Sequence, residues 1–338
     1  MEQKKNQTLE LLKLLAAYMV VFIHVPFYGV FGSTADALAR FAVPLFFLVS
    51  GFFSYNITPK KIGKRILHIF SLMIFAILLY EVYKTVLFLG RGDPQGLAEY
   101  FSIYTEPVMW VKLFTLNQPF HGNYIWYLPA LIYVYFSHYL CIVLKIKDKV
   151  IFIVSFVLLV IHIILAEGLL IFDFRIPESV IRNFLLMGLP FYGMGLMARK
   201  YEERLQRTPM PVAMGILMFG IAATLLSRMF IGKNELYLGS VFVLIALVIV
   251  FIRFKDVKYP KSLTEPAECS TYIYIMHILV RDTLLILYPL CGLDYGSSVS
   301  LQMLHPLAVC LITTVFAYLF ILMLRLIHTM KKPKAEKA

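Results

Sequence analysis

Charged residues are scarce in this chain of 338 residues, because Asp, Glu, Lys and Arg together make up only 15% of it. Soluble domains carry about 25% charged residues, so the scarcity excludes an ordinary soluble protein and a charge-rich disordered one. Cysteine is scarce too: the four cysteines show neither a CxxC pair nor a Cys–His spacing, which excludes a disulfide scaffold and predicts no metal site. Glycine and proline, with 18 and 16 residues, are too few for a collagen-like or low-complexity chain.

Apolar residues fill the chain instead, at 60% hydrophobic and 15% aromatic. A helix needs roughly 20 apolar residues to cross the hydrocarbon of a membrane, and ten stretches approach that length. The sequence therefore predicts an all-α polytopic bundle that forms one domain over residues 1–330, followed by a basic cytoplasmic tail, 331–338. The ten expected spans are Leu9–Phe31, Leu38–Tyr55, Ile66–Leu89, Tyr124–Leu144, Val150–Leu170, Val180–Ala198, Pro211–Phe230, Tyr237–Ile252, Thr271–Leu290 and Met303–Ile327.

The net charge of +12 reflects the orientation of these spans. With a cytoplasmic N-terminus, 22 of the 32 Lys and Arg residues fall on the cytoplasmic side, which is what the positive-inside rule predicts for an even number of spans with both termini cytoplasmic. Short basic loops face anionic lipid, so we expect membrane lipid and not nucleic acid as their partner. These residues are Lys4, Lys5, Lys60, Lys61, Lys64, Arg65, Lys145, Lys147, Lys149, Arg199, Lys200, Arg204, Arg207, Arg253, Lys255, Lys258, Lys261, Arg325, Lys331, Lys332, Lys334 and Lys337.

Three ionisable residues lie in the first expected span: Glu10, Lys13 and His24. An ionised side chain inside a membrane costs about 2.5–3.5 kcal/mol even on a lenient scale, so each is a functional candidate. Lys13 and His24 are eleven residues apart, which places them on one helix face roughly 16 Å apart, while Glu10 is spaced to pair with Lys13. His24 is the foremost candidate because an imidazole accepts a proton near neutral pH. The competing interpretations are a packing histidine and a lysine that snorkels to the interface.

The cytoplasmic mouth of the third span carries Arg65 and His68 on one face. Two such groups suit a phosphate-bearing donor, although a positive-inside anchor is the plainer explanation. In the second span, Pro44 and Gly51 flank Ser50 in a segment that either lines a cavity or packs against another helix.

Further polar and aromatic residues stand at expected outer ends of spans, where an aromatic belt or an ordinary span end explains them equally well. His277 and Arg281 are one turn apart on one face of the ninth span. The candidates on the cavity or acceptor side are Ser50, Trp126, Tyr127, Arg182, His277 and Arg281.

Jointly these motifs resemble the acyltransferase-3 family of ten-helix membrane acyltransferases. The acidic, basic and histidine residues of the family's first helix are matched by Glu10, Lys13 and His24. Two departures concern the donor, since the family usually has arginine where this chain has Lys13 and an arginine pair where it has Arg65 and His68. The other matching segments are Val43–Phe53, Trp126–Leu128 and Ser270–His277.

The resemblance implies O-acyl transfer, typically of acetyl from acetyl-CoA, to a hydroxyl of a cell-envelope carbohydrate in a bacterial plasma membrane. It implies acyl-CoA as co-substrate with no bound cofactor, a donor site of Lys13, Arg65 and His68, and catalysis by His24 with Lys13 and Glu10. His24 either takes the hydroxyl proton or carries the acyl group itself. The acceptor is an envelope glycan or a lipid-linked sugar.

Two other classes of function stay open on the sequence. Prolines interrupt several spans, and broken helices form the substrate sites of many transporters, so the chain also fits a transporter of a small polar solute or a glycan. Its similarity to the membrane domain of vancomycin-resistance serine racemases points to an amino acid such as serine as that solute. A non-catalytic scaffold is the third class, and it leaves His24 and Lys13 unexplained.

Overall fold

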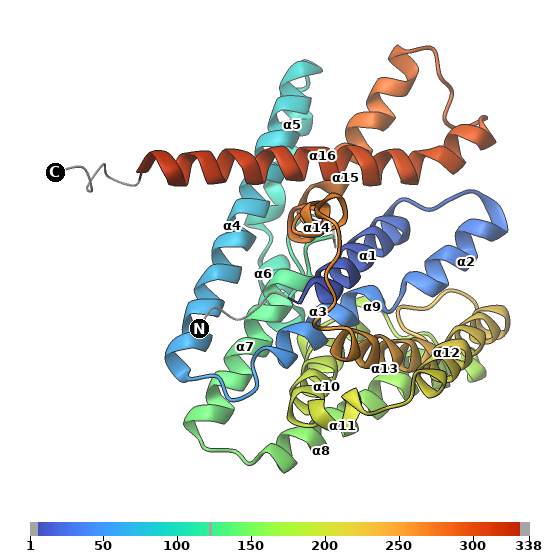
Figure 1. Ribbon diagram of the computed structural model, residues 1–338. Coiled ribbons are helices and arrows are strands. Elements are labelled where there is room, and N and C mark those ends of the chain that lie inside the picture. The colour runs from blue at the N-terminus through green and yellow to red at the C-terminus, as the bar shows by residue number, and fades with distance from the viewer. Residues whose placement is uncertain (1–5, 122–123, 332–338) are drawn as a thin grey trace. The chain divides into compact units, whose positions relative to one another are not determined.

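A computed structural model describes residues 6–121 and 124–331, which form helices and, within those ranges, no strand (Figure 1). The all-α class is therefore confirmed. Lys4, Lys5 and residues 332–338 of the expected basic tail lie outside the described residues, so the placement of both termini stays a prediction.

The helices are α1 (Gln7–His24), α2 (Gly29–Ala39), α3 (Ala42–Phe52), α4 (Pro59–Gly90), α5 (Pro94–Ser102), η1 (Ile103–Thr105), α6 (Pro107–Leu116), α7 (Tyr127–Val143), α8 (Asp148–Ile163), η2 (Ile164–Gly168), η3 (Leu169–Phe172), α9 (Glu178–Ile181), η4 (Phe184–Gly188), α10 (Leu189–Lys200), α11 (Glu202–Gln206), α12 (Met210–Ile231), α13 (Leu238–Arg253), α14 (Lys261–Ala267), α15 (Ser270–Leu290) and α16 (Val299–Lys331).

Seven helical segments of the described chain are long and apolar enough to cross a membrane, and each corresponds to one of the ten expected spans. The fourth and eighth expected spans correspond to α7 and α13, which are apolar but have only 17 and 16 residues. The sixth corresponds to η4 and α10. The membrane character is thus shown, whereas the count of ten spans stays a prediction.

The first expected span, Leu9–Phe31, is wrong at its C-terminal end, because α1 stops at His24 and the next helix begins at Gly29. Pro26 explains the stop: proline has no N–H to donate and disfavours helical geometry in the residue before it. That residue, Val25, has φ −131° and ψ 78°. His24 therefore lies at the end of a helix and not in its middle.

The sixth expected span, Val180–Ala198, is also not one continuous helix. The short helix α9 ends at Ile181, and Asn183 adopts extended backbone. The Asn183 side chain then accepts hydrogen bonds from the backbone N–H groups of Leu185 and Leu186, both at 2.9 Å, and so caps the π-helix η4. Asparagine suits this position because its side-chain oxygen replaces the acceptor that a helix start lacks.

The described chain groups into two compact units, one of which combines the N-terminal segment up to Asp36 with the segment from Phe254 onward. In this first unit α1 packs against α14, α15 and α16. The Thr8 hydroxyl donates to the Phe254 carbonyl at 2.7 Å, and the Tyr259 N–H donates to the Gln7 side chain at 2.8 Å. These bonds tie the N-terminal part of α1 to the segment that begins at Phe254.

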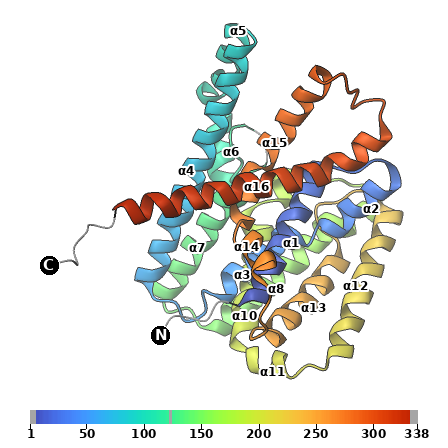
Figure 2. The ribbon, with the colours of Figure 1, turned by 45° about the horizontal axis from the view of Figure 1, so that its top comes forward.

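The second unit, Ala37–Arg253, is built from helix pairs: α3 with α10, α4 with α7, and α12 with α13. Figures 1 and 2 show α12 and α13 running side by side. The approach of α3 to α10 is very close, since a Cβ added at Gly51 would lie 2.0 Å from the Tyr192 carbonyl oxygen. The interpretation that the segment with Gly51 packs against another helix is confirmed.

Candidate active site

The position of His24 follows from where α1 begins and ends. The helix begins where the Asn6 side chain accepts the N–H of Leu9 at 3.0 Å, and it ends before Pro26. Over its 18 residues the helix keeps Lys13 and His24 on one face, roughly 16 Å apart along the axis.

His277, on α15 of the same unit, lies beside His24. The two imidazole centroids are 5.4 Å apart and the rings are inclined by 31°. His277 is completely buried, and its Nδ1 lies 2.7 Å from the Tyr274 carbonyl oxygen. Because a carbonyl only accepts, the neutral His277 ring carries its proton on Nδ1, which leaves a lone pair on Nε2. Within the described residues, Nε2 is buried and has no hydrogen-bond partner.

Arg281, one turn beyond His277, fixes the end of α1. Its Nη1 lies 3.4 Å from the His24 carbonyl oxygen, which is one of the terminal acceptors that a helix leaves unpaired. The guanidinium also binds the carboxylate of Asp282 through Nε at 2.9 Å and Nη2 at 2.7 Å. Arg281 therefore has a structural role at the end of α1, in addition to any contact with a substrate.

Glu10 and Lys13 form the ion pair that their spacing predicts. The Lys13 ammonium lies 3.1 and 3.0 Å from the two Glu10 oxygens, with both side chains partly exposed. Lys13 thus keeps its charge within reach of a solvated ligand, at the end of α1 opposite His24.

Arg65 and His68 belong to the second unit, whereas Lys13 belongs to the first. The Arg65 guanidinium donates to the Phe53 carbonyl oxygen at 2.9 Å and to the Ser54 hydroxyl at 2.7 Å. A cation at these acceptors stabilises the C-terminal end of α3. His68 is exposed. The proposal that all three hold a donor stays a prediction.

Ser50 and Tyr127 are brought together between α3 and α7, with their hydroxyl oxygens 3.4 Å apart. Trp126 is buried and packs against Phe47, at 6.1 Å between ring centroids. Burial excludes the alternative that Trp126 belongs to an aromatic belt facing lipid.

Arg182 belongs to a largely buried group of charges that the sequence did not reveal. Its guanidinium lies 5.8 Å from the Trp126 ring and 3.7 Å from the Glu235 carboxylate, which also binds Arg40 at 3.0 Å. Arg40 directly follows α2, and Glu235 lies in the loop between α12 and α13, 195 positions away, so no local spacing connects them.

His305 is a second residue that sequence reasoning missed. It is buried in α16, and its Nδ1 lies 2.8 Å from the Tyr288 hydroxyl. The signal was available, because an ionisable side chain in the tenth expected span, Met303–Ile327, meets the same cost criterion as His24.

Comparison with known families matches residues 6–322 to the family model Acyl_transf_3, described as an acyltransferase domain. No curated protein and no solved structure gives a significant match. The family match covers nearly the whole chain, including both helices that carry His24 and His277, and it favours an enzyme over a transporter or a scaffold. The chain therefore belongs to the acyltransferase-3 family and is a membrane acyltransferase.

Proposed function

We propose that the protein moves an acyl group, typically acetyl, from cytoplasmic acyl-CoA to a hydroxyl of a cell-envelope carbohydrate, in the plasma membrane of a bacterium. The acceptor is an envelope glycan or a lipid-linked sugar. The observation that carries the proposal is the close pair of His24 and His277, in which the buried Nε2 of His277 has no hydrogen-bond partner among the described residues. A lone pair held in that state is suited to orient a neighbouring group that receives a proton.

In the direct route, the acceptor hydroxyl gives its proton to the imidazole of His24 as its oxygen attacks the thioester carbonyl. The C–S bond breaks, and the proton returns to the leaving thiolate, so the products are an ester and free CoA. In the stepwise route, a nitrogen of His24 attacks the thioester carbonyl first, the C–S bond breaks, and the thiolate of CoA takes the proton that the acylated imidazole releases. The acceptor hydroxyl then attacks the acyl-imidazole, which gives the ester and returns the hydroxyl proton to His24. In both routes His277 serves as a positioning residue that orients the His24 ring.

Donor binding is assigned to Lys13, with Arg65 and His68 as further candidates. Lys13 supplies a cation near one end of α1, and the phosphates of CoA are the complementary anions. Arg65 donates to two neutral acceptors at the end of α3, which leaves its positive charge available to an anion.

The experiment uses purified protein in proteoliposomes, with labelled acetyl-CoA inside and a glycan acceptor outside. We expect His24→Asn to lower kcat about 10²- to 10⁴-fold, which is the usual contribution of a general base. Unchanged transfer by His24→Asn and His24→Ala would refute the role of His24. Solute flux, measured in the same vesicles, separates transport from acyl transfer.

Lys13 variants test the donor assignment separately. Lys13→Ala should raise the KM for acetyl-CoA about 10- to 100-fold through the loss of a charge-assisted hydrogen bond. Lys13→Arg should keep or lower that KM, since its forked donors suit phosphate. An equal kcat loss in both variants, without a change in KM, would contradict donor binding by Lys13.

A single-turnover reaction without acceptor distinguishes the two routes. Label that stays on the wild-type protein and is absent from His24→Asn indicates the stepwise route. Absence of label from both proteins, together with normal transfer by the wild type when acceptor is added, indicates the direct route.

A further inference from the structure

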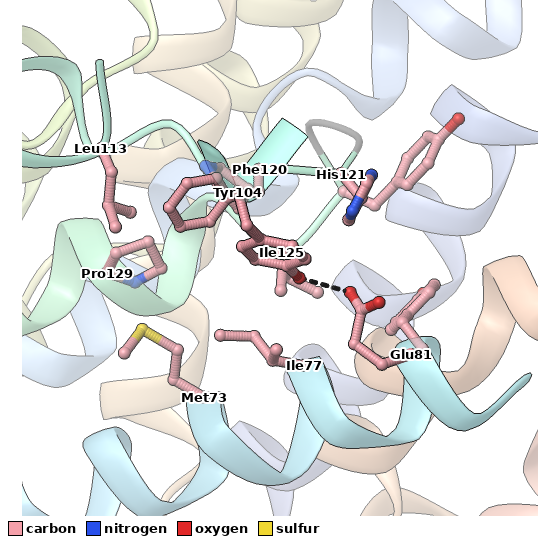
Figure 3. Close-up of a pocket in the computed structure, with 12 residues that line it drawn as sticks. Met73, Ile77, Glu81, Tyr104, Leu113, Phe120, His121, Ile125 and Pro129 are labelled. Carbon is pink, nitrogen blue, oxygen red and sulfur yellow. Dashed lines mark hydrogen bonds between the residues drawn. The ribbon is translucent and has the colours of Figure 1, made fainter. Parts of the chain in front are cut away.

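A cavity of about 120 Å³ lies in the second unit, against the middle of α4 (Figure 3). Its wall is mostly apolar and includes Met73 and Ile77 of α4, Leu113 of α6 and Pro129 of α7. An apolar cavity of about 150 Å³ holds a benzene molecule, so this one has room for a body of about six carbons.

Two buried polar atoms at this cavity lack hydrogen-bond partners among the described residues: Oε2 of Glu81 and Nε2 of His121. The other Glu81 oxygen, Oε1, accepts the Tyr104 hydroxyl at 2.7 Å and the Tyr100 hydroxyl at 3.4 Å. Figure 3 shows the Tyr104 bond and places His121 on the same side of Glu81 as Tyr104. Leaving a buried polar atom unpaired costs more free energy than a typical hydrogen bond contributes, so a donor for Oε2 is expected from a ligand.

Packed aromatic side chains hold Glu81 and His121 in place, so neither side chain is free to turn toward another partner. The His121 ring stacks on Tyr100, with centroids 3.7 Å apart and an interplanar angle of 10°. The Trp110 N–H donates to the Tyr104 carbonyl oxygen at 2.9 Å, and the Trp110 ring meets Phe120 edge-on at 4.7 Å.

An uncharged alcohol has both a donor for Oε2 and an acceptor for Nε2. Its O–H donates to Glu81 Oε2, and its lone pairs accept from His121 when that ring carries its proton on Nε2. Burial lowers the pKa of His121, with the nearby Lys84 acting in the same direction and Glu81 opposing both, so the neutral ring is favoured. A hydrocarbon leaves both atoms unpaired, and an ammonium, although it suits the carboxylate, has no lone pair for His121.

We propose that this cavity binds an uncharged hydroxyl-bearing amphiphile, with the hydroxyl between Glu81 and His121 and an apolar body of about six carbons against Met73, Ile77 and Leu113. The proposal does not depend on acyl transfer by His24. The hydroxyl comes either from a membrane lipid or from a free alcohol.

Binding is measured with the full chain carrying Trp126→Phe, which leaves Trp110 as the single tryptophan and as a reporter beside the cavity. The probe is cyclohexanol, added to detergent-purified protein. We expect a saturable change in Trp110 fluorescence with cyclohexanol and none with methylcyclohexane. Glu81→Gln should weaken cyclohexanol binding about tenfold, the difference between a charged and a neutral acceptor.

Two further variants separate ligand binding from the structural task of Glu81. Tyr104→Phe removes the hydroxyl that binds Oε1 but keeps the carboxylate, so it should bind cyclohexanol as tightly as the parent. Ile77→Phe fills the cavity and should abolish binding while the protein stays folded. Equal affinity in Glu81→Gln and the parent, or no saturable signal with cyclohexanol, would overturn the proposal.

The source of the hydroxyl is tested in nanodiscs of phosphatidylcholine with and without diacylglycerol, which adds a lipid hydroxyl. Weaker apparent binding of cyclohexanol in the presence of diacylglycerol assigns the cavity to a lipid. Unchanged saturable binding assigns it to a free alcohol, and loss of binding in both membranes counts against the site.

Discussion

The close contact of α3 with α10 predicts that one methyl group added at Gly51 lowers the stability of the protein strongly. A Cβ added at Gly51 would lie 2.0 Å from the Tyr192 carbonyl oxygen, about 1.4 Å short of the 3.4 Å at which ordinary contact begins. The obstacle is backbone, so no side chain can rotate away and the two helices themselves must separate. Overpacking of this kind costs about 1–3 kcal/mol, and here we expect the upper part of that range.

Gly51→Ala also gains helix propensity, worth roughly 0.5–1 kcal/mol, which offsets a part of the cost. Gly215→Ala in α12 is the matched control, because no heavy atom lies within 4 Å of its added Cβ. The control should therefore be neutral or stabilising by that same propensity gain. Unfolding midpoints in one detergent should fall in the order Gly215→Ala, wild type, Gly51→Ala.

Gly195→Ala meets the same interface from the other helix, at 1.9 Å from the Leu48 carbonyl oxygen. One separation of α3 from α10 relieves both clashes, so the double variant should lose less stability than the two single losses added together. A Gly51→Ala midpoint equal to that of Gly215→Ala, or strictly additive losses, would refute the close packing of α3 and α10.

Two electrostatic predictions concern other parts of the second unit. Glu235→Gln leaves Arg40 and Arg182 without their shared carboxylate and should cost about 3–5 kcal/mol in unfolding free energy. Glu178→Gln, at an exposed side chain, should cost less than about 1 kcal/mol in the same denaturant titration. For His121, burial lowers the pKa below its usual 6.5, so its stabilising contribution is fully present above pH 6.5. That contribution is lost as pH falls through 6.5 toward the pKa of the folded protein, and His121→Gln should flatten this part of a melting-temperature profile.

The long apolar helices were predictable because composition alone places them in a membrane. Expected spans such as Pro211–Phe230 and Thr271–Leu290 match α12 and α15 to within one residue at each end. Proline and capping groups fix such ends locally, and local patterns are what a sequence displays.

The errors arose where a polar residue or a proline interrupts an apolar run. Hydropathy averages across Pro26 and across Asn183, so two expected spans ran past breaks that a single residue imposes. The charges of Arg40 and Glu235 meet 195 positions apart in sequence, and only the packing of the unit brings them together.

The cost of placing ionisable groups in a membrane selected the candidate residues, but it did not distinguish their roles. Lys13, Arg65 and Arg281 all have protein partners at 3.1 Å or less, so these contacts within the protein offset the cost of placing a charge in a membrane. The buried Nε2 of His277 has no such partner among the described residues. An unpaired buried group costs about 1–3 kcal/mol, and this cost is offset only when a substrate or a neighbouring ring supplies a hydrogen bond. Activity should therefore depend more steeply on His277 than on Arg281. We expect His277→Gln to reduce kcat and Arg281→Lys chiefly to lower the unfolding midpoint. The reverse pattern would move the catalytic assignment away from the histidine pair.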